Sequence, residues 1–322
     1  MAYVIGIDGG GTKTSCLFKH VNAFSSHGET ENSESMMVIG EATNPYVVGF
    51  TEMKKRLQGL IAHGMASYSV KPDDIRAVSC GLAGVGRTED EQEVETLFQQ
   101  IFSELNFSEN SAFSIHSDSY IALRGALPPE VNEGILVISG TGSSAIGTDS
   151  AGDVFRSGGW GHILGDEGSG HQIGMHALKS IVKAYDARGE DTLLSHAILD
   201  YLDFAHPKEL IRYIYRTKPE KKEIARLARH VMEAADQGDD VARDILYEAA
   251  DELTLHVESL HKKCPAFHDR TPVMTTGSIF THSKDLTNKF KRNIESKQLG
   301  IYESAYRSPA YGAALLAREN VN

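Results

Sequence analysis

Two glycine-rich segments carry residues that could bind phosphate. The first reads Asp-Gly-Gly-Gly-Thr-Lys-Thr over 8–14, and the second reads Ser-Gly-Thr-Gly-Ser-Ser over 139–144. Each lies between a short apolar run (3–7 or 134–138) and a second strand-like stretch, which predicts a β-hairpin in both places. Glycine permits the close approach and positive φ that such turns need, and threonine and serine add hydroxyl donors without charge. Because two similar turns each open one half of the chain, we favour two facing phosphate-binding hairpins over two plain turns.

Two other phosphate motifs fit less well. A P-loop needs GxxxxGK[ST], but here only Thr12 separates Gly11 from Lys13, and a strand-like stretch follows instead of a helix. The string from Gly140 to Ala145 matches the dinucleotide fingerprint, yet glycines and aspartates follow over 147–153 and prevent a helix from starting there. We therefore expect neither a P-loop nor a Rossmann site.

Two aspartates stand at predicted strand ends. Asp8 follows the first strand and suits Mg²⁺, which binds through one or two carboxylates and keeps several waters, although an Asx turn is the alternative. Asp118 follows a short strand over 113–116, where its carboxylate can accept a proton from an attacking hydroxyl. The alternative for Asp118 is an N-cap of the helix expected over 119–127.

Composition limits the classes of partner. The 322 residues are 41% hydrophobic and 24% charged, as in a globular protein. With a net charge of -12 and scattered Lys and Arg, we expect no nucleic-acid or membrane surface. No apolar run approaches the roughly 20 residues that cross a bilayer, and the first strand begins too early for a signal peptide. Three dispersed cysteines (Cys16, Cys80, Cys264) favour the cytoplasm.

Strand-like and helical segments follow one another along the chain, and the repeated opening of the two halves suggests two related lobes. The first half has an apolar strand at 75–80 and a helical apolar stripe after Thr51. The second half is more helical. We expect its helices at 170–187, 221–235 and 241–263, a strand at 272–276 and a last helix at 309–318.

Several motifs in order resemble one family. The segments 8–14 and 139–143 resemble its two phosphate motifs, Gly277-Ser278 its adenosine motif, and 308–313 the helix that returns to its first lobe. The stretch 158–169, with Gly-Gly-Trp-Gly-His and Gly-Asp-Glu-Gly-Ser, is similar to the family's sugar-pocket loop. The chain thus resembles the N-acetylglucosamine kinase branch of the BadF/BadG/BcrA/BcrD-type ATPases, in the actin/hexokinase/heat-shock-70-like superfamily.

The resemblance implies a particular architecture. This is a two-lobed actin-like (ribonuclease H-like) α/β fold, with duplicated lobes and a nucleotide cleft between them. The first lobe would be 1–128, completed by a C-terminal helix at 308–322. The second lobe would be 129–307, with a hinge near residue 128.

The resemblance also implies an activity, the transfer of the γ-phosphate of Mg-ATP to the 6-hydroxyl of N-acetylglucosamine or a close amino sugar. Asp118 would be the general base and Asp8 would hold Mg²⁺ through water. The ATP ligands would be Gly10, Gly11, Thr12, Lys13, Thr14, Gly140, Thr141, Gly142, Ser143, Gly277 and Ser278. The sugar ligands would be Asn44, Asp118, Gly159, Trp160, Asp166 and Glu167.

Residue types alone leave several of these roles open. Asp166 and Glu167 would also suit the first turn of a helix, Trp160 a hydrophobic core, and Lys13 a solvated turn. The residues after Asn44 vary within the family, so glucosamine and N-acetylmuramic acid remain alternative substrates.

Two other classes of function compete with a kinase. An ATPase activator of an acyl-CoA dehydratase or reductase would need a cysteine pair, which is missing here. A sugar sensor would carry a helix-turn-helix module before the first strand, and we expect none here, because the first strand already begins at Tyr3. The resemblance further suggests a homodimer.

Overall fold

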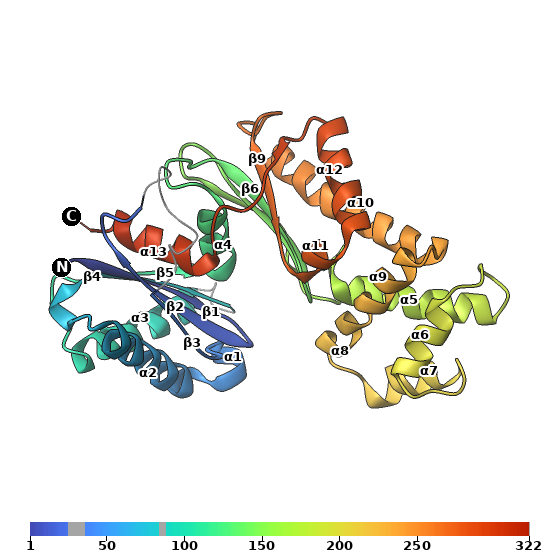
Figure 1. Ribbon diagram of the computed structural model, residues 1–322, viewed down its shortest axis with the longest axis horizontal. Helices are drawn as coiled ribbons and strands as arrows, with labels where there is room; N and C mark the ends of the chain where they lie inside the picture. The colour runs from blue at the N-terminus through green and yellow to red at the C-terminus, as the bar shows by residue number, and fades with distance from the viewer. Residues whose placement is uncertain (25–35, 84–87, 322) are drawn as a thin grey trace. The chain divides into compact units, whose positions relative to one another are not determined.

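The chain folds into two compact units (Figure 1). A computed structural model describes residues 1–24, 36–83 and 88–321, without the side chains of 88–91. The first unit is Met1–Asn132 with Ala305–Asn322, and the second is Glu133–Ser304. Within the described residues, we find no helix with the length and apolar character of a membrane span.

The first unit is built on a mixed five-stranded sheet in the order β3-β2-β1-β4-β5. Antiparallel pairs join β1 to β2 and β2 to β3, whereas β4 and β5 run parallel to β1. The strands are β1 (Tyr3–Gly9), β2 (Lys13–His20), β3 (Met37–Glu41), β4 (Ile75–Leu82) and β5 (Ala112–Ser117). The hairpin predicted around residue 10 is confirmed, because three residues join β1 to β2.

Helices cover both faces of this sheet (Figure 1). Ile5 and Ile7 of β1 pack with α2 (Phe50–Tyr68) and α3 (Thr88–Glu104), while Val4 packs on the opposite face with α13 (Pro309–Glu319). The face of α13 also carries α4 (Asp118–Ala126), and the short elements are α1 (Pro45–Val48) and the 3₁₀ turn η1 (Pro72–Asp74). The alternation along β1 is that of a strand with both faces buried.

The second unit repeats the topology of the first. Its sheet has the order β10-β9-β6-β7-β8, with β6-β7-β8 antiparallel and β9 and β10 parallel to β6. The strands are β6 (Gly134–Ser139), β7 (Ser143–Thr148), β8 (Val154–Gly158), β9 (Pro272–Thr276) and β10 (Ile301–Tyr302). Strand by strand, β6 to β10 occupy the places of β1 to β5, which confirms the predicted duplication.

Most helices of the second unit lie between β8 and β9. They are α5 (Gly170–Tyr185), α6 (Leu194–Tyr201), α7 (Glu209–Arg212), the π-turn η2 (Tyr213–Thr217), α8 (Lys221–Arg226), α9 (Ala228–Asp236) and α10 (Asp240–Lys263). Two more helices follow β9, namely α11 (Ser278–His282) and α12 (Lys284–Ser296).

The prediction of a single helix over 221–235 is wrong. The structure has α8 and α9 there, separated by Leu227. Leu227 donates its N–H to the carbonyl of Ile224, three residues back, and its carbonyl accepts from the N–H of His230 as well as from that of Val231, so the α-helical pattern is locally disturbed. The helices predicted at 170–187 and 241–263 are confirmed as α5 and α10.

Two glycines let α4 and α13 cross at close range. A Cβ atom on Gly125 would lie 2.2 Å from the carbonyl oxygen of Ser308, and one on Gly312 would lie 2.0 Å from that of Ile121. The buried Arg124 of α4 also pairs with Glu319 of α13 at 3.0 Å. This packing binds the C-terminal helix to the first unit.

We expect Gly312→Ala to destabilise the first unit by about 1–3 kcal/mol, because the added methyl group overlaps the backbone of α4. Gly59→Ala is the matched control, since Gly59 lies on the exposed side of α2 and a Cβ atom added there would have no heavy atom within 4 Å. That change should stabilise by about 0.5–1 kcal/mol through helix propensity. Urea unfolding measures both, and equal effects of the two substitutions would contradict the packing argument.

Candidate functional site

Backbone hydrogen bonds on its inner side hold the first glycine turn, residues 10–12, in place. The N–H of Gly10 donates to the carbonyl of Lys13 at 3.0 Å, and the carbonyl of Gly10 accepts from the N–H of Thr43 at 3.1 Å. Gly11, by contrast, has no heavy atom within 4 Å of an added Cβ. The turn therefore presents its outer backbone to solvent while its base is held by the segment that follows β3.

Thr14 lies behind this turn. Its buried hydroxyl donates to the carbonyl of Glu41 at 2.7 Å and lies 2.8 Å from the hydroxyl of Thr43. The side chain of Thr14 is thus engaged inside the unit, whereas Gly11, Thr12 and Lys13 are exposed.

Asn44 extends the same connection. It is the N-cap of α1, where its Oδ1 accepts from the N–H of Tyr46 at 2.9 Å. Because Thr43 bonds to both Gly10 and Thr14, the predicted sugar-binding asparagine directly follows a residue that is hydrogen-bonded to the predicted phosphate hairpin.

Asp8 and Asp118 come to the same end of the first sheet. The strand register places Gly9 beside Leu82, and Leu82 beside Ser117. Asp8 precedes this row and Asp118 follows it. Burial, together with the charge of Asp118, raises the pKa of Asp8 to about 6, while Lys13 has an opposing effect.

Asp118 opens α4 but does not cap it. The N-cap is Ser117, whose hydroxyl accepts from the N–H of Tyr120 at 3.3 Å. Asp118 accepts from the N–H of Ser119 at 2.8 Å, in the first turn of the helix, where the helix dipole favours a negative charge. The N-cap alternative for Asp118 is therefore wrong.

The two carboxylates fit a divalent cation. Mg²⁺ prefers oxygen ligands and binds proteins through few carboxylates. Asp8 is desolvated and repelled by Asp118, so a cation at this edge of the sheet would relieve an unfavourable interaction. The donor set suits the hydrated Mg²⁺ predicted at Asp8.

The second glycine turn, residues 140–142, has the same length as the first and is fastened more strongly. The N–H of Gly140 donates to the carbonyl of Gly142 at 2.9 Å. Three more bonds tie the turn and its flanks to 167–170: Gly170 N–H to Gly140 carbonyl (2.8 Å), Ser139 hydroxyl to Gly168 carbonyl (2.7 Å) and Ser143 hydroxyl to Glu167 carbonyl (2.6 Å).

Asp166 lies directly behind the second turn. It is 3% exposed and has a φ of 62°. One carboxylate oxygen accepts from the N–H of Ser143 at 3.3 Å, and the other lies 2.5 Å from the Nζ atom of Lys221. The first-turn alternative for Asp166 and Glu167 is wrong, because α5 begins at Gly170 with Ser169 as its N-cap.

Lys221 is a site residue that we did not predict. It is the first residue of α8, where a positive charge opposes the helix dipole. An unfavourable lysine at the start of a predicted helix was the one available signal, since its partner Asp166 is remote in sequence.

The predicted sugar loop is largely exposed in the second unit. Trp160 is 75% exposed, and the neighbouring Ile163 and Leu164 are also exposed. Trp160 is therefore not a core residue, and that alternative is wrong. Gly159 has a φ of 76° and donates its N–H to the carbonyl of Ser143 at 3.1 Å, which joins the loop to the second hairpin.

The predicted adenosine motif also lies at this end of the second sheet. Gly277 follows β9, and Ser278 begins α11. A Cβ atom on Gly277, whose φ is 105°, would lie 2.1 Å from the carbonyl oxygen of Ser139. Gly277 thus packs against the strand end that leads into the second hairpin.

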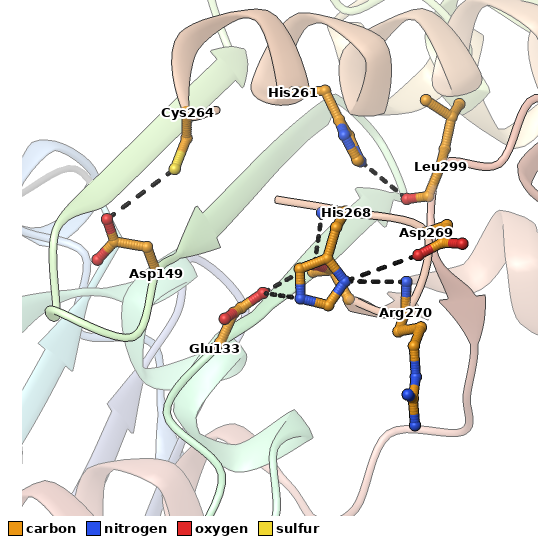
Figure 2. Close-up of polar contacts among 9 residues, drawn as sticks. Glu133, Asp149, His261, Cys264, His268, Asp269, Arg270 and Leu299 are labelled. Carbon is orange, nitrogen blue, oxygen red and sulfur yellow. Dashed lines mark hydrogen bonds and ion pairs between the residues drawn. The ribbon is translucent and has the colours of Figure 1, made fainter. Parts of the chain in front are cut away.

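A separate polar cluster lies at the opposite end of the second sheet (Figure 2). Glu133 accepts from the hydroxyl of Thr271 at 2.8 Å and lies 3.6 Å from His268. Glu133 and Thr271 directly precede β6 and β9, whereas the hairpin follows β6. The cluster ties the strand starts together and is not part of the candidate site.

Two units of this strand order, each opening with a glycine-rich hairpin, define the actin-like ATPase fold class. Within that class, the model of the BadF/BadG/BcrA/BcrD ATPase family matches residues 5–317, and the chain belongs to this family.

Similar proteins are known from several organisms. The N-acetylmuramic acid/N-acetylglucosamine kinase of Clostridium acetobutylicum is 36% identical over 99% of both chains. The N-acetyl-D-glucosamine kinase of Dictyostelium discoideum is 29% identical over 97% of both. A solved structure from Chromobacterium violaceum matches with a TM-score of 0.73 and 24% identity, covering 99% of both chains, which shows the fold alone.

His256 of α10 lies beneath the start of the predicted sugar loop. Its Nδ1 atom is 3.1 Å from the hydroxyl of Ser157, and a Cβ atom on Gly158 would lie 2.6 Å from its ring. Burial lowers the pKa of His256, and the nearby Glu167 and Asp166 only partly oppose this effect. The ring therefore stays neutral where an exposed histidine would begin to protonate.

We expect the free energy of unfolding to fall as the pH drops below about 6.5, by up to about 1.4 kcal/mol per pH unit for His256. The unfolded chain binds the proton near the ordinary histidine pKa, whereas the folded ring resists it, so acid favours unfolding. His256→Gln should flatten this dependence, and His63→Gln, at an exposed position, should leave it unchanged. Urea unfolding between pH 5 and 8 measures the slopes, and parallel curves for all three proteins would exclude the contribution of His256.

Proposed function

We propose that the protein is an ATP-dependent kinase that transfers the γ-phosphate to the 6-hydroxyl of N-acetylglucosamine or a close amino sugar. The observation that carries this proposal is the placement of Asp8 and Asp118 at one end of the first sheet, beside a glycine turn. Membership of an ATPase family and the names of two relatives support it.

The first unit supplies the reacting end of the site. Asp118 accepts the proton of the attacking sugar hydroxyl, as a carboxylate in this role does in other phosphoryl transfers. Asp8 would hold a hydrated Mg²⁺, which would neutralise charge on the phosphates. The backbone N–H groups of Gly10, Gly11 and Thr12, with the Lys13 ammonium, contact phosphate oxygens, and Thr14 supports this turn from behind through Thr43.

The second unit holds the nucleotide and part of the sugar. Gly140, Thr141, Gly142 and Ser143 offer N–H and hydroxyl donors to phosphate, and Gly277 and Ser278 contact the adenosine. Gly159, Trp160, Asp166 and Glu167 are the sugar contacts that we propose for this unit, and Asn44 is the one that we propose for the first unit. Because the segment 166–170 is bonded to the second hairpin, sugar contacts there would be coupled to phosphate contacts. We place this reaction in the cytoplasm, where the three buried thiols remain reduced.

N-acetylmuramic acid is the second candidate substrate. The relative from Clostridium acetobutylicum, 36% identical to this chain, carries both sugars in its name. N-acetylmuramic acid differs from N-acetylglucosamine by a lactyl ether at its 3-hydroxyl. An assay that includes both sugars therefore decides between them.

We expect ADP release to depend on one amino sugar and to fall by about 10²–10⁴-fold in Asp118→Asn, because the amide cannot accept the hydroxyl proton. A coupled assay with Mg-ATP should compare N-acetylglucosamine, N-acetylmuramic acid, glucosamine, N-acetylmannosamine, glucose and no sugar. Asp244→Asn, at an exposed position on α10, serves as the control and should keep full activity.

ATP hydrolysis at the same rate with and without sugar would favour the ATPase activator. The absence of any ATP turnover would favour the sugar sensor. Either result would overturn the kinase. Full activity in Asp118→Asn would be compatible with a kinase but would contradict the role of Asp118 as its general base.

A further inference from the structure

Lys221 makes a partly buried ion pair behind the second hairpin. Its Nζ atom lies 2.5 Å from Asp166, whose side chain is 4% exposed, while that of Lys221 is 30% exposed. A carboxylate this deeply buried is unfavourable unless a cation and hydrogen bonds compensate its lost hydration. Lys221 supplies the cation, and the N–H of Ser143 supplies a hydrogen bond at 3.3 Å.

The pair also touches the turn itself. A Cβ atom on Gly142 would lie 2.7 Å from the Nζ atom of Lys221 and 2.9 Å from Oδ1 of Asp166. The backbone of the turn therefore rests directly on both charged groups. No side chain larger than hydrogen fits at residue 142 without moving them.

The local sequence offers a natural comparison. Lys221 and Lys222 are neighbours at the start of α8, and both pair with a carboxylate. Lys222 pairs with Glu220, and both of these side chains are more than 60% exposed, which makes a pair that contributes little. Only Lys221 points to the hairpin.

We propose that Lys221 is a positioning residue for nucleotide binding, acting through Asp166 to hold the hairpin 140–142 in shape. This inference rests on the proposed function, since it assumes that the hairpin binds phosphate. In this proposal Lys221 acts through Asp166 and not by contacting the nucleotide. Removal of Lys221 would leave a buried carboxylate without its cation, and the turn that rests on it would shift.

The test is a double-mutant cycle read by nucleotide affinity. Isothermal titration with Mg-AMPPNP, without sugar, should show affinity reduced by about 10- to 100-fold in Lys221→Met. Lys222→Met should stay within about twofold of the parent protein. Lys221→Met combined with Asp166→Asn should regain most of the loss, because the amide leaves no buried charge to compensate and still accepts from Ser143.

Two results would overturn the proposal. Parent-like affinity in Lys221→Met would mean that the ion pair does not shape the hairpin. A loss that Asp166→Asn does not relieve would mean that Lys221 contacts the phosphates directly.

Hydrogen exchange separates this proposal from the proposed function. The amides of 140–143 should exchange at least about tenfold faster in Lys221→Met than in Lys222→Met, whether or not a nucleotide binds. If the parent protein bound no nucleotide, the proposed function would fail, and faster exchange would still establish the positioning of the hairpin. Unchanged exchange would refute the positioning itself.

Discussion

The candidate site depends on the register of the parallel strands in each sheet. In the first unit, Gly9, Leu82 and Ser117 lie side by side, so Asp8 and Asp118 reach one edge although most of the first unit separates them in sequence. In the second unit, Ile138 pairs with Thr276, which brings Gly277 against the end of β6. Because parallel strands end at a common edge, loops from distant segments gather there. A shift of one residue in either register would separate these groups.

The two units use the same topology with different chemistry behind the turn. In the first, neutral hydroxyls of Thr14 and Thr43 hold the hairpin against the segment that carries Asn44. In the second, the buried pair of Asp166 and Lys221 takes this place. A fully hydrogen-bonded network of neutral hydroxyls costs little free energy to bury. An ion pair, in contrast, leaves an uncompensated buried charge when either partner is removed. The second hairpin is thus more sensitive to a single substitution.

Local patterns predicted the elements well, and side-chain partners poorly. Both hairpins were readable because an apolar run, a glycine turn and a second strand lie together in sequence. The short β10 was missed because two residues carry no period, and α12 was missed although Leu286, Phe290 and Ile294 recur at a helical spacing. Asp118 was expected at a strand end, but the choice of Ser117 as N-cap depends on side-chain geometry. The partner of Asp166 could not be predicted, because only the folded chain brings α8 to the hairpin. The binding roles of the site residues remain predictions.

The distribution of charge supports the proposal that a cation binds to the first unit. Asp8 and Asp118 repel one another at the edge where the turn would receive phosphate, and the chain as a whole carries a charge of -12. Lys13 alone cannot offset two carboxylates and the phosphates of a nucleotide. A divalent ion would resolve this conflict, since it would attract the carboxylates and the phosphates at once. The second unit faces no such conflict, because Asp166 is already matched by Lys221 and its turn presents neutral N–H donors. In the proposed function, metal-dependent chemistry would fall to the first unit, while the second would contribute neutral, directional contacts.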